Sequence, residues 1–311
     1  MPLKVCVPNR RKGDLIDPMN PVPGFPFSMM DDVEYCADLK KADVIFPDFG
    51  SNPFTGEVQA IMAAIMREKW FEKYAHKIVF VSLCDFPYYS QTIEEGIKFV
   101  LSPLPGKERN KQCNVHAMPI HPCINDYRVQ MDAAYTSHCR VQPKGYRFGF
   151  AGQLTGGAQV RFFGGRKWIL DLSEGKLKGC MFHRDQCGWA FANEWAAAHK
   201  KWMLDMAGCH YGFAPAGASN GPRGWWTMQV GTIPIFTDIE LFPFEDEVDW
   251  SKLCIQIPHE EKASFDYMSL PIEGPEYDQM RSNVMAFWDE YCWMPKLAKR
   301  MGKKIEEHIG K

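Results

Sequence analysis

The sequence lacks three features, each of which would define a class of protein. It contains no run of about 18 apolar residues, so no transmembrane helix is predicted. Its first residues lack a basic stretch followed by an apolar one, so no signal peptide is predicted. Its 36 lysines and arginines do not exceed its 38 aspartates and glutamates, which argues against nucleic-acid binding driven by a basic excess. We therefore expect a soluble, cytoplasmic protein without a nucleic-acid partner.

The sequence also lacks the cysteine pattern of a small disulfide-stapled domain. Its eleven cysteines are an odd number scattered over 311 residues, so we expect mostly buried, reduced thiols. No paired short cysteine spacing of the zinc-ribbon kind occurs, although cysteines and histidines gather in two places. These are Cys113, His116, His121, Cys123, His138 and Cys139, and then Cys180, His183 and Cys187. Structural zinc is the minor alternative, and we expect no metal.

Apolar residues are abundant and are arranged in alternating strand-like and helix-like stretches. They make up 46% of the chain, and aromatic residues make up 14%, enough for a sizeable core. The alternation predicts an α/β fold with parallel strands. The predicted strands are residues 3–7, 42–46, 77–83, 146–151, 210–214, 232–236 and 253–257. The predicted helices are residues 31–41, 56–74, 166–172, 193–207, 224–229, 277–291 and 295–309.

The chain is long enough for two domains, at roughly 100–200 residues per domain. Two α/β units are predicted to meet at a hinge near residues 140–146. We expect a first domain over 1–142, a second over 143–285, and final helices over 286–311 that pack back on the first. The sequence shows no internal repeat and no low-complexity segment.

Three carboxylates directly follow predicted strands, namely Asp48, Asp85 and Asp238. In open parallel sheets, ligands bind at the carboxyl ends of the strands. Asp85 is flanked by apolar neighbours including Phe86, which predicts a raised pKa that suits a general base near neutral pH. The alternative, which spacing alone favours, is that such an aspartate caps a helix or a turn.

Two glycine-containing loops in the second half predict an anion site. One spans residues 152–157 after a predicted strand, and the other spans residues 215–222 before a predicted helix. Backbone N–H groups in such loops can hold phosphate, and Arg161, Arg166 and Arg223 would add positive charge. The alternative is a pair of ordinary strand-to-helix turns with surface arginines. Together the two loops favour a diphosphate ligand.

Ordered motifs in the second half, spread over about 100 residues, are specific enough to suggest a family. They are Phe150-Ala151-Gly152 with Arg161 or Arg166, Trp202-x3-Met206-x4-Tyr211-Gly212-Phe213-Ala214-Pro215-x-Gly217, Pro222-Arg223, Gly231-Thr232-Ile233-Pro234-Ile235, Leu241-x-Pro243-Phe244 and Asp249-Trp250. Residues 42–46 and 80–85 add a thinner likeness in the first half. With these motifs the chain resembles the exostosin-like glycosyltransferases, which are similar to the GT-B architecture of two Rossmann-like domains facing each other across a cleft.

The resemblance implies transfer of a sugar from a UDP-sugar to a hydroxyl group of an acceptor oligosaccharide or glycoprotein glycan. The first domain would bind the acceptor, and the second would bind the nucleotide sugar. No cofactor and no metal are expected, because cations and helix termini can stabilise the leaving diphosphate. The absence of the family's stem makes the chain similar to the stand-alone versions of large algal viruses. This likeness favours UDP-xylose as the donor and the cytoplasm, including that of an infected host cell, as the location.

Under this resemblance the site residues fall into three groups. Asp85 would deprotonate the acceptor hydroxyl in an inverting reaction, with Asp48 as the alternative base. The acceptor would contact Phe49, Phe86 and Tyr88. The donor would contact Gly152, Gln153, Arg161, Arg166, Ala216, Gly217, Asn220, Arg223, Thr227 and Asp238.

One position departs from the family pattern. Three residues after the Pro-Arg arginine the family usually has a glutamate that can hold the ribose hydroxyls, and here this residue is Trp226. We expect Asn220, Thr227 or Asp238 to make the ribose contact instead. The departure also leaves open a second function, that of a non-catalytic glycan-binding module that kept the fold and lost donor binding.

Overall fold

The computed structural model describes residues 2–6, 33–46, 67–81, 99–102, 114–117, 132–152, 166–184, 195–215, 223–237, 239 and 242–310. The chain divides into two compact units, Met1–Pro122 with Met294–Lys311, and Cys123–Trp293. The sequence-based division lay at residues 142 and 143, whereas helix α5 (Ala133–Arg140) groups with the second unit. Of the helices in the described ranges, none is long and apolar enough to cross a bilayer.

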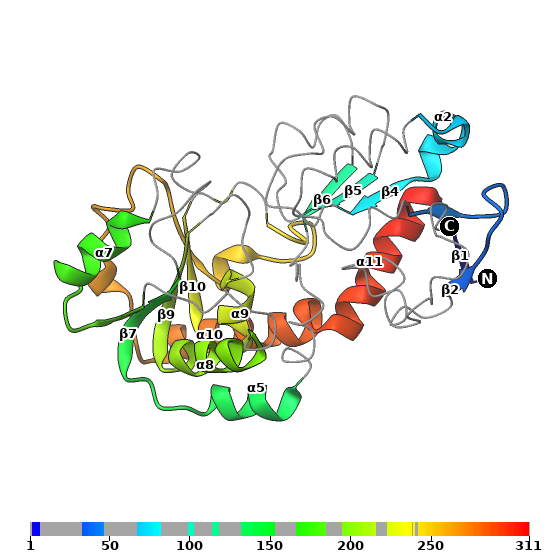
Figure 1. Ribbon diagram of the computed structural model, residues 1–311. Helices are drawn as coiled ribbons and strands as arrows, with labels where there is room; N and C mark the ends of the chain where they lie inside the picture. The colour runs from blue at the N-terminus through cyan, green and yellow to red at the C-terminus, as the bar shows by residue number, and fades with distance from the viewer. Residues whose placement is uncertain are drawn as a thin grey trace. The chain divides into compact units, whose positions relative to one another are not determined.

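The first unit contains parallel strands in two hydrogen-bonded groups of three (Figure 1). The orders are β2-β1-β3 and β4-β5-β6, and a parallel bridge between Ile45 and Ile78 makes the two groups continuous. The strands are β1 (Leu3–Cys6), β2 (Val33–Tyr35), β3 (Val44–Ile45), β4 (Val79–Val81), β5 (Phe99–Ser102) and β6 (Asn114–Ala117). The helical elements are α2 (Lys69–Tyr74), η2 (Ala75–Lys77) and α11 (Met294–Ile309).

The predicted helix over residues 31–41 is wrong. Residues Val33–Tyr35 form strand β2, which pairs in parallel with β1 through Leu3 and Val33, and through Val5 and Tyr35. Valine and tyrosine fit a pleated surface well, and the neighbouring strand supplies backbone partners that an isolated segment lacks. The chain then turns at Asp38, whose carboxylate accepts a hydrogen bond from the Lys40 backbone N–H at 2.9 Å.

The second unit contains a five-stranded, fully parallel sheet with the order β11-β10-β9-β7-β8. Its strands are β7 (Tyr146–Ala151), β8 (Met181–Arg184), β9 (Cys209–Pro215), β10 (Ile233–Thr237) and β11 (Ile255–Ile257). Its α-helices are α5, α7 (Lys167–Glu174), α8 (Trp195–Ala207), α9 (Arg223–Gln229) and α10 (Pro275–Phe287). It also has two short 3-10 helices, η4 (Trp250–Lys252) and η5 (Tyr267–Ser269), and a π-helical segment, η6 (Trp288–Cys292). The predicted α/β fold with parallel strands is therefore confirmed.

Apolar side chains cover both faces of this sheet. On one face α8 and α9 lie side by side across β7, β9 and β10 (Figure 1). They approach closely because Gly212 has no side chain: a Cβ there would lie 2.6 Å from Thr227 Cγ2 and 2.8 Å from Met206 Cε. On the opposite face Phe213 packs edge-on against Trp168 of α7 and Tyr267 of η5, with ring centroids 5.6 and 5.3 Å apart. The core of the unit therefore lies on either side of the sheet.

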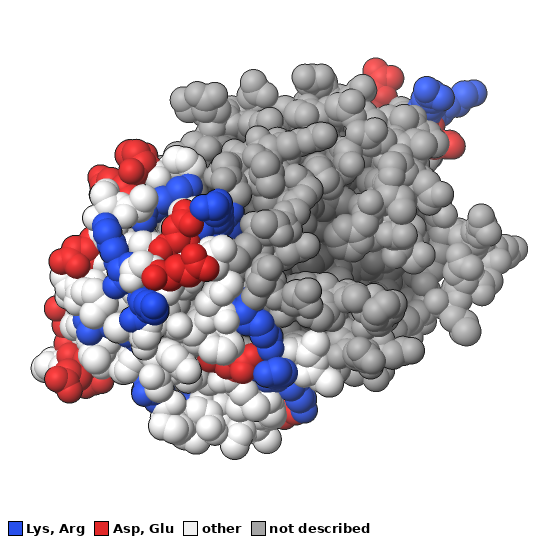
Figure 2. Space-filling model, turned by 60° about the vertical axis from the view of Figure 1, so that its left-hand side comes forward, with Lys and Arg blue, Asp and Glu red and all other residues white. Residues whose placement is uncertain are grey.

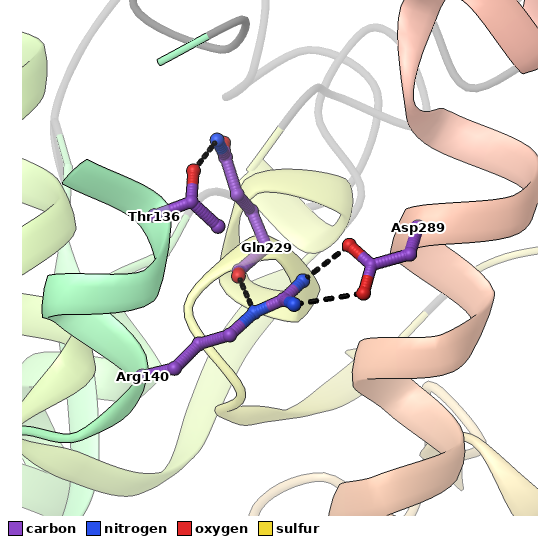
Figure 3. A network of polar contacts seen from close by, with 4 residues as sticks. All are labelled: Thr136, Arg140, Gln229 and Asp289. Carbon is purple, nitrogen blue, oxygen red and sulfur yellow. Dashed lines mark hydrogen bonds and ion pairs between the residues drawn. The ribbon is translucent and has the colours of Figure 1, made fainter. Parts of the chain in front are cut away.

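A polar network joins α5, α9 and η6 (Figure 3). Arg140 donates two hydrogen bonds of 2.8 Å to the Asp289 carboxylate, and its Nε donates to the Gln229 carbonyl at 2.8 Å. The Gln229 side-chain amide donates to Thr136 Oγ1 at 2.9 Å, and both of these residues are buried. Because a planar guanidinium matches a carboxylate at two points, the network orients η6 as well as holding it. It thus anchors the segment that directly precedes α11 to the second unit.

Candidate functional site

The order of the strands in the second unit points to one place on its sheet. Counted along the chain, β7, β8, β9, β10 and β11 have the spatial order 2-1-3-4-5, so the winding direction reverses between β7 and β9. In doubly wound sheets, ligands bind outside the carboxyl ends of the strands at this reversal. Gly152 directly follows β7 there, and the helix after β9 begins at Arg223. These two residues are the described part of the candidate site.

Arg223 lies against the end of β7. A Cβ on Gly152 would be 2.8 Å from Cζ and 3.0 Å from Nε of Arg223, so the guanidinium occupies the space that any other residue at 152 would fill. The same guanidinium lies 5.8 Å from the centroid of the buried Phe150 ring. Gly152 therefore allows the guanidinium to lie close to the end of β7, and the positive charge of Arg223 lies at the β7–β9 reversal.

The end of the neighbouring strand β8, at Arg184, is held by a hydrogen bond and an ion pair. The Gly152 backbone N–H donates to the Arg184 carbonyl at 3.0 Å, which continues the β7–β8 ladder past its last pair. Arg184 forms a 2.8 Å ion pair with Asp205 of α8, and Lys201 approaches the same carboxylate at 3.6 Å. The Arg184 charge is thus balanced by Asp205.

Thr227 lies beneath Arg223. It is only 1% exposed, its hydroxyl donates to the Arg223 carbonyl at 2.6 Å, and its methyl group faces Gly212. In this arrangement Thr227 supports the first turn of α9 from inside. Any effect of Thr227 on a ligand would therefore act through the position of Arg223.

Trp226, the residue at the family's glutamate position, belongs to the core. It is 1% exposed and packs edge-on against His199 and Trp202 of α8, with ring centroids 4.4 and 5.7 Å apart. Burial lowers the pKa of His199 to about 3, so this imidazole is neutral at physiological pH. Trp226 thus contributes apolar packing between α8 and α9.

Thr237 is a residue of this edge that the sequence analysis missed. It ends β10 and is 1% exposed, and its hydroxyl has no hydrogen-bond partner among the described residues. Thr237 pairs with Pro215 of β9, and β9 pairs with β7 up to Gly149 and Gly212. Within the described part of the chain this buried hydroxyl is available as a hydrogen-bond donor to a ligand at the edge. Its one sequence signal was its place directly before Asp238.

The remaining predicted site residues are distributed as follows. Arg166 is buried, at 4% exposure, and directly precedes α7, where its carbonyl accepts a hydrogen bond from the Ile169 N–H. The others lie outside the described residues and stay predictions. They are Asp48, Phe49, Asp85, Phe86, Tyr88, Gln153, Arg161, Ala216, Gly217, Asn220 and Asp238.

The predicted metal candidates are only partly described. Within the described ranges, no three residues of the kinds His, Cys, Asp or Glu come together in a way that would hold a metal ion. Cys139 is buried in α5, and its burial raises the pKa of the thiol to about 11, which disfavours the thiolate that zinc requires. Cys113, His121, Cys123 and Cys187 lie outside the described residues.

Charges of both signs are interspersed on the described surface. In Figure 2, lysines and arginines alternate with aspartates and glutamates across the described part of the visible face. Such mixing leaves little long-range field of one sign, since opposite charges screen one another. Recognition of an anion would therefore depend on locally placed cations such as Arg223.

Among known proteins, the chain is similar to several solved structures. The chain matches no protein-family model, and it matches no curated protein. It is similar to the crystal structure of a glycosyltransferase from Rickettsia africae ESF-5, with 9% sequence identity and a TM-score of 0.45. The match covers 87% of this chain and 78% of that chain. A likeness at this level decides neither the fold nor the activity of the chain.

Proposed function

We propose that the protein transfers a sugar from a UDP-sugar to a hydroxyl group of an acceptor glycan. The observation that supports this most is the Arg223 guanidinium, held against Gly152 where the strand order reverses. A guanidinium presents paired N–H donors that match phosphate oxygens. At the reversal of a doubly wound sheet, such a group suits the diphosphate of a nucleotide sugar.

In this proposal the second unit stabilises the leaving UDP. Arg223 contacts the diphosphate together with Arg161, Arg166 and the amides of the loops that follow β7 and β9. Fixed cations aimed at the charge that develops on the leaving oxygen lower the barrier without rearrangement during the reaction. We propose that these groups replace a metal ion and that Thr237 donates its buried hydroxyl to the same ligand.

In this proposal the first unit binds the acceptor and contains the general base. The acceptor oxygen attacks the anomeric carbon of the donor, its proton passes to the Asp85 carboxylate, and the bond from that carbon to the diphosphate oxygen breaks. The attack from the opposite side inverts the anomeric centre. Phe49, Phe86 and Tyr88 would stack on the acceptor sugar, and Asp48 is the alternative base.

Replacing Asp85 by asparagine is expected to lower kcat about 10²- to 10⁴-fold, the usual contribution of a positioned general base. The affinity for UDP should stay at the wild-type value, because Asp85 does not contact the donor in this proposal. Initial rates of UDP release and calorimetric titration with UDP measure the two quantities. Near-normal turnover of Asp85→Asn would transfer the role to Asp48, which Asp48→Asn then tests.

Replacing Gly152 by alanine is expected to weaken UDP binding several-fold. The new methyl group would take the place of the guanidinium, which is the mobile end of its side chain, and would also press on the Phe150 ring at 2.9 Å. The cost to the free energy of unfolding should be about 1–3 kcal/mol, as for other overpacked sites. Gly145→Ala is the matched control, since a Cβ at Gly145 meets nothing within 4 Å. Equal UDP affinity of the two variants would contradict the site.

The test of the function is a panel of UDP-sugars, beginning with UDP-xylose, assayed for slow donor hydrolysis without an acceptor. Release of UDP from one donor, with thermal stabilisation by UDP, supports the transferase. A second candidate, the non-catalytic glycan-binding module, follows from Trp226, since the family's carboxylate is absent and its position is built into the core. Glycan binding with no stabilisation by millimolar UDP and no turnover would favour that module.

A further inference from the structure

Two cysteines of the first unit are neighbours on adjacent parallel strands. The β1–β2 register pairs Leu3 with Val33, Lys4 with Glu34 and Val5 with Tyr35. The Cys36 backbone N–H donates to the Val5 carbonyl at 2.9 Å, so the ladder continues by one more residue. The next pair in this register is Cys6 and Cys36.

The spacing of the two strands suits a covalent link. Neighbouring strands lie about 4.8 Å apart, so in-register Cα atoms are separated by about that distance. Disulfides span Cα separations of about 4.4–6.8 Å. Register partners also project to the same face of a sheet, here the face of Lys4 and Glu34, two positions earlier. The two thiols of Cys6 and Cys36 are therefore placed side by side.

The two thiols differ in access to solvent. Cys6 is 2% exposed, and its burial, followed by the proximity of Cys36 and then of Asp38, raises the pKa of its thiol to about 11. Cys36 directly follows β2, which lies at one edge of the β2-β1-β3 group; it is partly exposed, and its thiol donates to the Asp38 carbonyl at 3.5 Å. A reagent in solution therefore reaches the Cys36 sulfur first. The buried Cys6 sulfur reacts in a second step, with the Cys36 sulfur.

We propose that Cys6 and Cys36 form a redox-sensitive pair that a low-molecular-weight disulfide, such as oxidised glutathione, converts into an intramolecular disulfide. The Cys36 thiolate attacks the reagent, forms a mixed disulfide and releases one thiolate. The Cys6 thiol then gives up its proton and attacks the Cys36 sulfur, which releases the second thiolate. Two cysteine thiols are oxidised, one reagent disulfide is reduced to two thiols, and the two cysteine protons end on those thiols. This modification is independent of the proposed glycosyl transfer.

The test uses the full-length protein incubated with oxidised glutathione at neutral pH, followed by alkylation, proteolysis and mass spectrometry. The expected result is the loss of the free thiols of Cys6 and Cys36 and the appearance of a peptide in which Cys6 is linked to Cys36. Dithiothreitol should reverse both changes. In Cys6→Ser, Cys36 should stop at the mixed disulfide with glutathione, and in Cys36→Ser the Cys6 thiol should stay reduced.

Cys180→Ser is the matched control, because Cys180 is also partly exposed but lies in the second unit. It should form the Cys6–Cys36 link in wild-type yield. The proposal is overturned if Cys36 links to any other cysteine, if it stays as a mixed disulfide in the wild-type protein, or if its only links join two chains. Cys36→Ser changes a partly exposed side chain, so it provides the decisive comparison even if Cys6→Ser does not fold.

Discussion

Replacing Arg223 by alanine is expected to weaken UDP binding about 10- to 100-fold. Hydrogen bonds to a charged group contribute about 1.5–3 kcal/mol, and about 1.4 kcal/mol corresponds to a tenfold change in Kd. Arg223 is the described residue whose charge lies at the β7–β9 reversal, packed on Gly152 and beside the Phe150 ring. Turnover should fall further than binding, because the same group would stabilise the charge that develops on the leaving diphosphate. Isothermal titration with UDP and initial rates measure the two effects.

A pair of lysine variants makes this prediction specific. Arg223→Lys keeps the positive charge but loses the planar fork, so its UDP affinity should lie between those of the wild type and Arg223→Ala. The matched control is Arg147→Lys. Arg147 lies near the amino end of β7, away from Gly152, and donates to the carbonyls of Met268 and Leu270. Its UDP affinity should equal that of the wild type. Arg223→Ala protein that folds normally and binds UDP as tightly as the wild type would remove the anion site from this edge.

Replacing Trp226 by glutamate is expected to unfold the second unit or nearly so. The side chain is 1% exposed and is enclosed by His199 and Trp202, so the variant loses a large buried ring and places a carboxylate among apolar groups. Loss of a buried tryptophan alone costs about 3–5 kcal/mol. The buried carboxylate adds to this cost, and a typical domain has only about 5–15 kcal/mol of stability. Denaturant unfolding followed by tryptophan fluorescence and circular dichroism measures the change.

Trp226→Phe is the companion variant, because it keeps an aromatic ring in the same space. It should lose much less stability than Trp226→Glu and should bind UDP with wild-type affinity. A Trp226→Glu protein of wild-type stability that binds UDP more tightly would contradict the core position of this residue. That result would mean that residue 226 faces the ribose, as the family pattern implies.

The elements with strong local signals were predictable from the sequence. Strands β7, β9 and β10 are mostly apolar and are followed by glycine or by a loop, which is typical of parallel strands buried on both faces. Helices α8, α9, α10 and α11 were also predicted, with small differences at their ends. The resulting α/β class needed no tertiary information, because each of these segments carries its own period and its own boundary.

The short elements were not predictable in the same way. Strand β8 has only four residues, Met181–Arg184, and includes a histidine and an arginine, so its pattern does not differ from that of a loop. Strand β2 was taken for part of a helix, although it has a valine and a tyrosine, because its three residues show no period. Helix α5 and strands β5 and β6 were also missed. Such segments become regular only when a neighbouring strand or helix supplies their partners.

Local sequence was sufficient to predict the α/β class and to select Gly152 and Arg223 as candidate anion-binding residues. Long-range packing was needed for the strand order, which brings the ends of β7 and β9 together and sets Arg223 on Gly152. It also directed Trp226 into the α8–α9 core and left the Thr237 hydroxyl at the edge of the sheet. The physical reason is that strand order and side-chain direction depend on contacts between distant segments. Propensity and spacing describe only neighbours along the chain.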